Sequence, residues 1–254
     1  DLEDPDKYFT AKTKFVAVTH QSNVLGTINP VKDIVRMAHD VGAVTLVDGA
    51  QWVPHGRTDM QDIDCDFYAF SGHKMLGPTG IGILYGKPEM LEKMQPFQGG
   101  GEMIKSVTME QATWNDIPYK FEAGTPNIAQ AIGLGAAVKY IQGIGLDVIQ
   151  NHGRDLTKYA IKQLTQMDSI KIHGNQHDRG PVISFEVTGV HPHDLAQFLD
   201  QDGIAIRAGQ LCAQPIMDKL GVFATNRASF YIYNNEQDIN KFCESIEKTA
   251  RIFA

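Results

Sequence analysis

The stretch from Phe67 to Gly80 (FYAFSGHKMLGPTG) constrains the fold of this chain more than any other. Its first residues predict a strand, Phe67 to Phe70, that ends in a turn of small residues. The turn presents the hydroxyl of Ser71, the imidazole of His73 and the amine of Lys74 close together. A lysine held between two rigid elements is suited to form a Schiff base with a carbonyl group. A solvated side chain is the alternative interpretation of Lys74, since most lysines are exposed.

A second predicted strand lies upstream of this turn, at Ala43–Val47. The run is short, apolar and rich in β-branched residues, as buried strands of parallel sheets are. Asp48 follows it directly and is therefore expected at the carboxyl edge of the sheet, where open α/β folds bind ligands. An aspartate there is the usual partner of a protonated pyridine nitrogen, and a helix cap is its alternative role. Asp48 and Lys74 are about one βα unit apart, so one cofactor is able to contact both.

Apolar runs and turn residues predict the remaining elements. Further strands are expected at Phe15–Thr19, Ile81–Tyr85, Val182–Val187, Ile204–Arg207 and Phe230–Tyr233, and helices at 29–41, Pro126–Ile144, Leu146–Met167, His191–Asp200 and Glu236–Phe253. Residues 99–119 are expected to form a long irregular segment, of a kind that is often functional. Short strands after Met167 predict a second, smaller α+β domain, so the expected domains are 1–145, which includes a linker helix, and 146–254.

Composition limits the classes of function. A chain of 254 residues with 43% hydrophobic and 21% charged residues is typical of a soluble globular protein with a sizeable core. The net charge of −7 argues against a general nucleic-acid binder, and no apolar run has the length of a membrane span. The acidic start, DLEDPDKYFTAK, is not typical of a signal peptide. Three scattered cysteines, Cys65, Cys212 and Cys243, indicate a reducing, cytoplasmic location rather than a disulfide framework.

Several motifs in the same order resemble one family. The sequences DGAQ at Asp48 and SGHKMLGPTGIGILY at Ser71 resemble the fold-type I pyridoxal-phosphate enzymes of the class V aminotransferase family. Within that family, RAGQLCAQP around Cys212 resembles the SUF-type (type II) cysteine desulfurases. FEAGTPN (121–127) and RASFYIYN (227–234) fit the same branch. The resemblance implies an α/β fold with a mainly parallel sheet flanked by helices, a smaller C-terminal α+β domain, and pyridoxal 5′-phosphate as the cofactor.

The resemblance runs from about Lys14 to the C-terminus and covers the C-terminal two-thirds of such enzymes. In the family, the turn that cradles the cofactor phosphate and the histidine that stacks on the pyridine ring precede the position of Asp1. We therefore expect this chain by itself to hold the cofactor weakly and to be inactive. Residues 1–145 correspond to the C-terminal part of the large, cofactor-binding domain.

The resemblance also implies roles for individual residues at the cofactor. Lys74 is expected to form the Schiff base and Asp48 to pair with the pyridine nitrogen. Gln51 is expected to bind the phenolic oxygen of the cofactor, for which a polar residue at a helix start is the alternative. The expected cofactor-binding residues are Asp48, Gln51, Ser71, His73, Lys74 and Thr125, with Ser71 and His73 on the phosphate. Thr125 reaches the phosphate of the neighbouring subunit in the family, which implies a homodimer; helix capping is its alternative role.

Cys212 decides the type of reaction. The resemblance makes it the nucleophile that accepts sulfur, whereas a single cysteine is otherwise a small buried hydrophobe. The family usually has histidines just before this cysteine, where this chain has Gln210 and Leu211, so the proton transfers there are expected to differ. The expected substrate-binding residues are Asn23, Arg207 and Arg227. The two arginines are suited to this role because a guanidinium group binds a carboxylate through two parallel hydrogen bonds. For Asn23 a turn after a strand is the alternative, and for each arginine a surface ion pair.

The implied activity is that of a cysteine desulfurase. L-Cysteine becomes L-alanine, a persulfide forms on Cys212, and the sulfur passes to an acceptor protein of the SUF system for Fe–S cluster assembly. Selenocysteine suits the same chemistry. The acceptor in one branch contains zinc, and His193, near His191, is a candidate ligand of that metal close to Cys212; a turn at His191 with His193 as a helix-start residue that caps or faces water is the alternative. No metal site of the chain's own is expected. Another class V aminotransferase or lyase, or an inactive truncated module, remains the alternative.

Overall fold

The computed structural model describes residues 4–253, which form two compact units. The first unit contains residues 4–20, 30–54 and 58–143. The second contains residues 21–29, 55–57 and 144–253. Two short segments of the second unit therefore interrupt the first in sequence, and the expected division of the chain after residue 145 stays a prediction.

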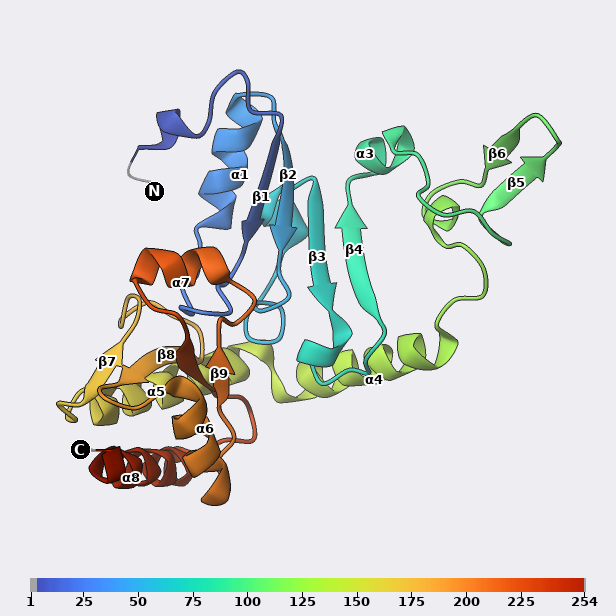
Figure 1. The fold of residues 1–254 in the computed structure, drawn as a ribbon. Coiled ribbons are helices and arrows are strands. Elements are labelled where there is room, and N and C mark those ends of the chain that lie inside the picture. Colours follow the sequence, from blue (N-terminus) through green and yellow to red (C-terminus); the bar gives the residue numbers. More distant parts are fainter. Residues whose placement is uncertain (1–3, 254) are drawn as a thin grey trace. The chain divides into compact units, whose positions relative to one another are not determined.

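A four-stranded sheet in the order β1-β2-β3-β4 forms the centre of the first unit (Figure 1). β1 (Phe15–Thr19), β2 (Val44–Asp48) and β3 (Phe67–Ser71) are parallel, and β4 (Gly82–Gly86) runs antiparallel to β3. Parallel neighbours require a crossover connection, and helix α1 (Val31–Asp40) provides it between β1 and β2. The strands and the helix expected in this region are confirmed.

Helix α1 packs on the sheet through one apolar face. Its buried residues, at helical spacing, are Val31, Ile34, Val35 and Ala38. Pro30 is the N-cap rather than the first helical residue, and Gly42 follows the helix with φ +74°, a conformation that glycine adopts without steric cost. Val31 and Val35 share a core with Val47 of β2 and Tyr68 of β3, so the same contacts that hold the helix also fix the central strands.

The other elements of the first unit are mostly short. They are η1 (Pro5–Lys7), α2 (Met60–Ile63), η2 (Gly72–Lys74), α3 (Pro88–Lys93), β5 (Ile104–Val107), β6 (Ala112–Trp114), η3 (Tyr119–Phe121) and α4 (Ile128–Ile144). The prediction of an irregular segment at 99–119 is wrong in part, because β5 and β6 form an antiparallel hairpin. Its turn is closed by Thr108 and Gln111 rather than by glycine or asparagine, which removes the usual hairpin signal.

Helix α4 carries apolar side chains on exposed as well as buried positions. Leu134 and Ile141 are buried, whereas Ile128, Ile132 and Tyr140 are more than half exposed. Within residues 4–253, no single helix combines the length and the apolar character that crossing a membrane requires; only α4 and α5 taken together, with a sharp break between them, meet that test by length and composition.

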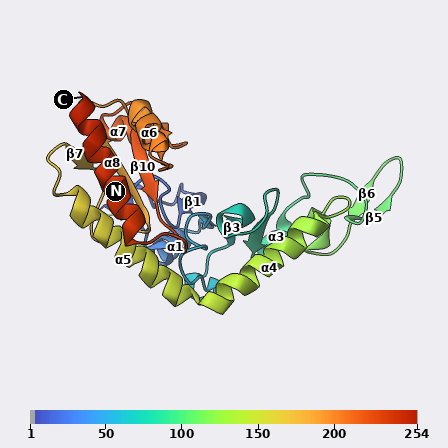
Figure 2. The ribbon, with the colours of Figure 1, turned by 90° about the horizontal axis from the view of Figure 1, so that it is seen from below.

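The second unit is built on an antiparallel sheet in the order β7-β8-β10-β9. The strands are β7 (Ile170–Ile172), β8 (Val182–Val187), β9 (Arg207–Gly209) and β10 (Thr225–Ser229). The helices are α5 (Leu146–Leu164), α6 (Pro192–Gln201), α7 (Gln214–Leu220) and α8 (Glu236–Phe253). α8 contacts both α5 and α6 (Figure 2), and the three helices close the main core of this unit.

Two strand predictions in this unit are wrong in position. The apolar residues Phe230–Tyr233 were the expected strand, but β10 is the preceding Thr225–Ser229, and β9 begins at Arg207 rather than at Ile204. β10 lies between β8 and β9, so its backbone is paired on both sides, and Thr225 and Asn226 are fully buried. Pairing with the neighbouring strands therefore outweighs the local apolar pattern.

We predict that Ile246→Ala destabilises the second unit by about 2–5 kcal/mol, because the side chain has no exposed surface and its loss leaves a cavity. Ile252→Ala, on the same helix at a position 56% exposed, is the control and should change the free energy of unfolding by less than about 0.5 kcal/mol. Denaturant unfolding of both variants measures the difference. Equal free energies of unfolding would show that the core of α8 is not packed as described.

Candidate functional site

Asp48 lies where the two central strands of the first sheet end. It is the last residue of β2, paired with Thr19 of β1 on one side and Ala69 of β3 on the other. Its carboxylate is exposed, and Oδ1 accepts a hydrogen bond of 2.9 Å from the backbone N–H of Ala50. A side chain on Gly49 would overlap the ring of Tyr68, so the chain is able to turn here only with glycine. Asp48 is therefore presented at the carboxyl edge of the sheet on a tightly packed turn.

Lys74 ends the short helix η2, directly after β3. The turn is compact, because the carbonyl of Gly72 accepts hydrogen bonds from the backbone N–H groups of Met75 and Gly77. A Cβ on Gly77 would lie 2.8 Å from the Gly72 oxygen, and one on Gly72 would lie 2.9 Å from Ile81. Glycines thus fix the backbone, while the amine of Lys74 remains exposed.

The other expected cofactor residues of the first unit are also accessible. Ser71 is half-buried in an extended conformation, and in the described structure its hydroxyl makes no capping bond to η2. His73 is exposed and Gln51 is half-buried in the turn after Asp48. Thr125 is exposed after Gly124, whose φ of +80° turns the chain toward α4.

His20 was not assigned a role from the sequence, yet it lies beside Asp48 at this edge. Its backbone N–H donates to the carbonyl of Asp48 at 2.8 Å. The imidazole Nδ1 and the Tyr68 hydroxyl are hydrogen-bonded at 2.8 Å, and the ring stacks on Trp52 at 4.5 Å. Burial lowers the pKa of His20 to about 4 and raises that of Tyr68, so the pair is uncharged near neutral pH. Its place directly after β1, in line with Asp48, was the available signal.

In the second unit, Arg227 and Asn23 are in direct contact. Arg227 Nη1 donates to the backbone carbonyl of Asn23 at 2.9 Å, and its buried Nε has no hydrogen-bond partner among the described residues. Desolvation lowers the pKa of Arg227; Arg207 lowers it further, whereas Cys212 raises it. The Arg207 guanidinium and the Cys212 thiol are thus both within electrostatic range of Arg227. Arg207 is exposed on β9, next to β10.

Cys212 is exposed in the loop between β9 and α7. Leu211 and Cys212 both have left-handed backbone conformations, with φ of 57° and 58°. The Leu211 side chain is buried with Val24 and Met217, and the carbonyl of Leu211 accepts a hydrogen bond of 2.8 Å from Nδ2 of Asn23. The loop therefore turns Leu211 inward and leaves the thiol of Cys212 accessible.

His191 and His193 are both exposed at the start of α6. Nδ1 of His191 accepts a hydrogen bond from the backbone N–H of His193 at 3.3 Å, so His191, not His193, is the capping residue. The two rings stack with centroids 5.7 Å apart. Among residues 4–253, no group of three or more histidine, cysteine or acidic side chains is arranged to bind a metal ion.

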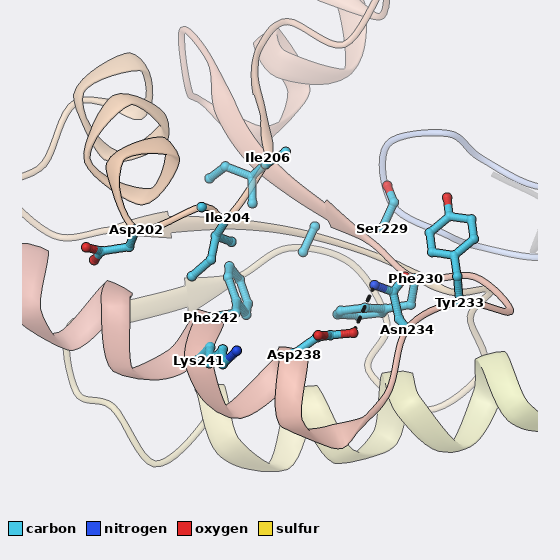
Figure 3. Close-up of a pocket in the computed structure, with 13 residues that line it drawn as sticks. Asp202, Ile204, Ile206, Ser229, Phe230, Tyr233, Asn234, Asp238, Lys241 and Phe242 are labelled. Carbon is cyan, nitrogen blue, oxygen red and sulfur yellow. Dashed lines mark hydrogen bonds between the residues drawn. The ribbon is translucent and has the colours of Figure 1, made fainter.

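The second unit also contains a cavity of about 470 Å³, and two of its lining residues, Ile206 and Ala228, adjoin Arg207 and Arg227 in sequence. Figure 3 shows Ile204, Phe230 and Phe242 around it, with Lys241 and Asp238 along the α8 side. Asp238 accepts hydrogen bonds from Asn234 and from the backbone of Asn235, which caps α8. None of the expected site residues lines this cavity.

The first unit offers the groups that pyridoxal phosphate requires. The cofactor needs a carboxylate for its pyridine nitrogen, a primary amine for its aldehyde, and donors for its phosphate. Asp48 and Lys74 supply the first two on neighbouring strand ends, and the uncommitted hydroxyl of Ser71 is a phosphate donor. The residues present therefore fit this cofactor.

Comparison with known proteins gives a consistent result. The profile of the family described as aminotransferase class-V matches residues 1–242. A probable cysteine desulfurase of Halalkalibacterium halodurans is 54% identical over 252 residues, which are 99% of this chain and 62% of the relative. A cysteine desulfurase of Haloferax volcanii is 52% identical over 255 residues, 100% of this chain and 60% of the relative.

The solved structure of the cysteine desulfurase CsdA from Escherichia coli has a TM-score of 0.95 and 37% identity. The match covers 100% of this chain and 63% of that one. This likeness confirms the fold class expected from the sequence. The chain spans about three-fifths of the length of the curated relatives it matches.

We predict that His20→Gln makes the stability of the protein depend less on pH below about pH 6.5. The lowered pKa keeps folded His20 neutral, whereas the unfolded chain takes up a proton below about pH 6.5, so stability falls as the pH drops from about 6.5 toward 4. Because glutamine does not titrate, the thermal midpoint of the variant should depend less steeply on pH in this range. His55, whose burial also lowers its pKa to about 4, contributes to the pH dependence that remains.

The control for this variant is His177→Gln, at an exposed site, which should leave the slope as it is. Midpoints measured between pH 4 and 8 provide the comparison. An unchanged slope in His20→Gln would contradict the burial argument.

Proposed function

Because the chain belongs to the class V aminotransferase family, we propose that it acts as part of a pyridoxal-phosphate-dependent cysteine desulfurase. The observation that carries this proposal is the contrast among its three cysteines. Burial raises the pKa of Cys65 and of Cys243 to about 11, which leaves both as unreactive thiols, whereas Cys212 is exposed beside two arginines. A desulfurase needs one accessible thiol, and an aminotransferase needs none.

The cofactor is proposed to lie at the carboxyl edge of the first sheet. When bound, pyridoxal phosphate withdraws electrons from the Cα of the amino acid that it holds. Asp48 would keep the pyridine nitrogen protonated, and Lys74 would bind the aldehyde. Ser71 and His73 would donate to the phosphate, and Gln51 to the phenolic oxygen. The accessible carboxylate, amine and hydroxyl on fixed turns support these roles.

The steps of the proposed reaction are assigned to different residues of the chain. Arg227, with Arg207 and Asn23, would bind the carboxylate of L-cysteine, since a desolvated guanidinium lacking a partner at Nε is suited to an anion. Lys74 would move the proton at Cα. The Cys212 thiolate would form an S–S bond with the substrate sulfur as the C–S bond breaks. The electron pair would remain with the carbon and take up a proton, which gives L-alanine. Selenocysteine fits the same sequence of steps.

The partners are also part of this proposal. The exposed Cys212 suits transfer of sulfur to an acceptor protein for Fe–S cluster assembly, and a zinc ion carried by that acceptor would bind His193. A homodimer is supported by the exposed apolar side chains of α4 and by the accessible Thr125. The reducing, cytoplasmic location expected from the free cysteines belongs to the same interpretation.

For the chain extended to the length of its curated relatives, we predict that Cys212→Ala abolishes alanine formation from L-cysteine but preserves the absorbance of bound cofactor. Lys74→Ala should abolish both, because it removes the amine that binds the cofactor. Cys243→Ala, at a buried position, is the matched control and should keep both. Alanine is measured by chromatography, and the persulfide by mass spectrometry of peptides. Full alanine formation by Cys212→Ala would instead favour another class V lyase or aminotransferase, and no absorbance in any variant would favour an inactive module.

For the chain extended to the length of its curated relatives, we predict that His193→Ala lowers acceptor-driven turnover roughly tenfold, the effect of about 1.4 kcal/mol of lost binding free energy. Turnover driven by a small thiol is the reference within each variant. His177→Ala, also exposed, is the matched control. If the acceptor drives the His193 variant as fast as the unmodified protein, His193 has no part in docking and only the exposure of Cys212 supports that interface.

A further inference from the structure

The loop that carries Cys212 has an unusual backbone. Leu211 and Cys212 are consecutive non-glycine residues, and both have a left-handed backbone conformation, with φ of 57° and 58°. Residues other than glycine adopt this region rarely, because Cβ approaches the following carbonyl oxygen. Such conformations persist only where the surrounding structure holds them. The contacts of the loop must therefore supply what its own conformational preference does not.

Two contacts hold Leu211. Its side chain is 5% exposed in a small core with Val24 and Met217. Its carbonyl accepts the 2.8 Å hydrogen bond from Nδ2 of Asn23. The second contact is specific, because it fixes the orientation of the peptide unit that joins Leu211 to Cys212, and with it the direction of the thiol.

Asn23 itself lies on a rigid support. The hydroxyl of Ser22 accepts hydrogen bonds from the backbone N–H groups of Val24 and Leu25. The carbonyl of Val24 accepts a bond of 2.6 Å from the buried Ser184 of β8. The segment that presents the Asn23 carboxamide is thus fixed on both sides of this residue.

The same residue also contacts Arg227. The backbone carbonyl of Asn23 accepts the 2.9 Å bond from Arg227 Nη1, while its side chain binds the Cys212 loop. One residue therefore links the guanidinium proposed for the substrate carboxylate to the backbone that aims the thiol.

We propose that Asn23 is a positioning residue that holds the Cys212 loop in its thiol-presenting conformation and couples it to Arg227. The proposal rests on the proposed function, in which Cys212 accepts the sulfur and Arg227 binds the carboxylate. Nδ2 of Asn23 keeps the Leu211 carbonyl in place, and a displacement of residue 23 changes the position of both groups together. Without the amide donor, the loop relaxes toward right-handed and extended conformations and the thiol loses its fixed direction.

The test is hydrogen–deuterium exchange of the peptide that spans residues 209–213, measured on the full chain without substrate. Asn23→Ala removes the donor and should accelerate exchange in this peptide about fivefold, the population change expected for one hydrogen bond of ordinary net strength. Asn23→Asp keeps the volume but offers no N–H, so it should accelerate exchange at least as much. It also tests the same bond if Asn23→Ala does not fold.

Asn115→Ala is the matched control, because Asn115 Nδ2 donates a bond of 2.9 Å to the Glu102 carbonyl in the first unit. It should leave exchange at 209–213 unchanged. Alkylation of Cys212 by a bulky maleimide is the second measurement, and its rate should change by a similar factor in Asn23→Ala but not in Asn115→Ala.

Unchanged exchange in both Asn23 variants would overturn the proposal, as would the same acceleration in Asn115→Ala. Wild-type rates in Asn23→Asp with acceleration in Asn23→Ala would also overturn it, since residue 23 would then act by its volume alone. Neither readout requires cofactor or turnover. The expected exchange pattern, together with no alanine formation by the chain extended to the length of its curated relatives, would refute the desulfurase and not the positioning role.

Discussion

The first unit depends on the in-register parallel pairing of β1, β2 and β3. This pairing aligns Thr19, Asp48 and Ala69, so that the chain leaves all three strands at the same edge. Every candidate cofactor residue of this unit except Thr125 follows β2 or β3 within a few positions. A slip in register would move Asp48 away from the turn that carries Lys74 and would also reverse which side chains face α1. The site and the core of this unit are thus specified by one set of backbone hydrogen bonds.

Tyr68 shows how closely the two are joined. Its fully buried ring packs with Val31, Val35 and Val47, and its hydroxyl reaches His20. The ring also fills the space that a side chain on Gly49 would occupy, which forces the turn after Asp48 into its observed path. A neutral His20 stacked on Trp52 adds no positive charge beneath the Asp48 carboxylate. The carboxylate therefore remains available to a cationic ligand instead of being paired within the fold.

Sequence reasoning succeeded where a local pattern and a turn carried the information. Ala43–Val47 followed by Asp48, and Phe67–Phe70 followed by SGHK, each combine a buried strand with an abrupt polar end, and both strands form as expected. Sequence reasoning failed where pairing between segments distant in sequence determines which residues form a strand. Thr225–Ser229 has no apolar alternation, yet it is the strand between β8 and β9, because neighbours on both sides satisfy its backbone. The cysteine loop belongs to the second class, since Asn23 and Leu211 are distant in sequence and no spacing rule connects them.

The second unit differs from the first in how it treats polar groups. The first presents the Asp48 carboxylate and the Lys74 amine on exposed turns, where both charged groups remain solvated. The second buries part of a guanidinium: Arg227 Nε is enclosed and unpaired among the described residues, and burial lowers the pKa of that side chain. Its charge persists at neutral pH nonetheless, because the ordinary pKa of an arginine lies far above neutral. Among residues 4–253, Arg227 is anchored at one end, by the Asn23 carbonyl, so an incoming carboxylate would offset a desolvation penalty that the fold already carries. Replacing this arginine by lysine would lose the geometry as well as the charge distribution, since an ammonium group is unable to bind the Asn23 carbonyl and a bidentate carboxylate from one plane.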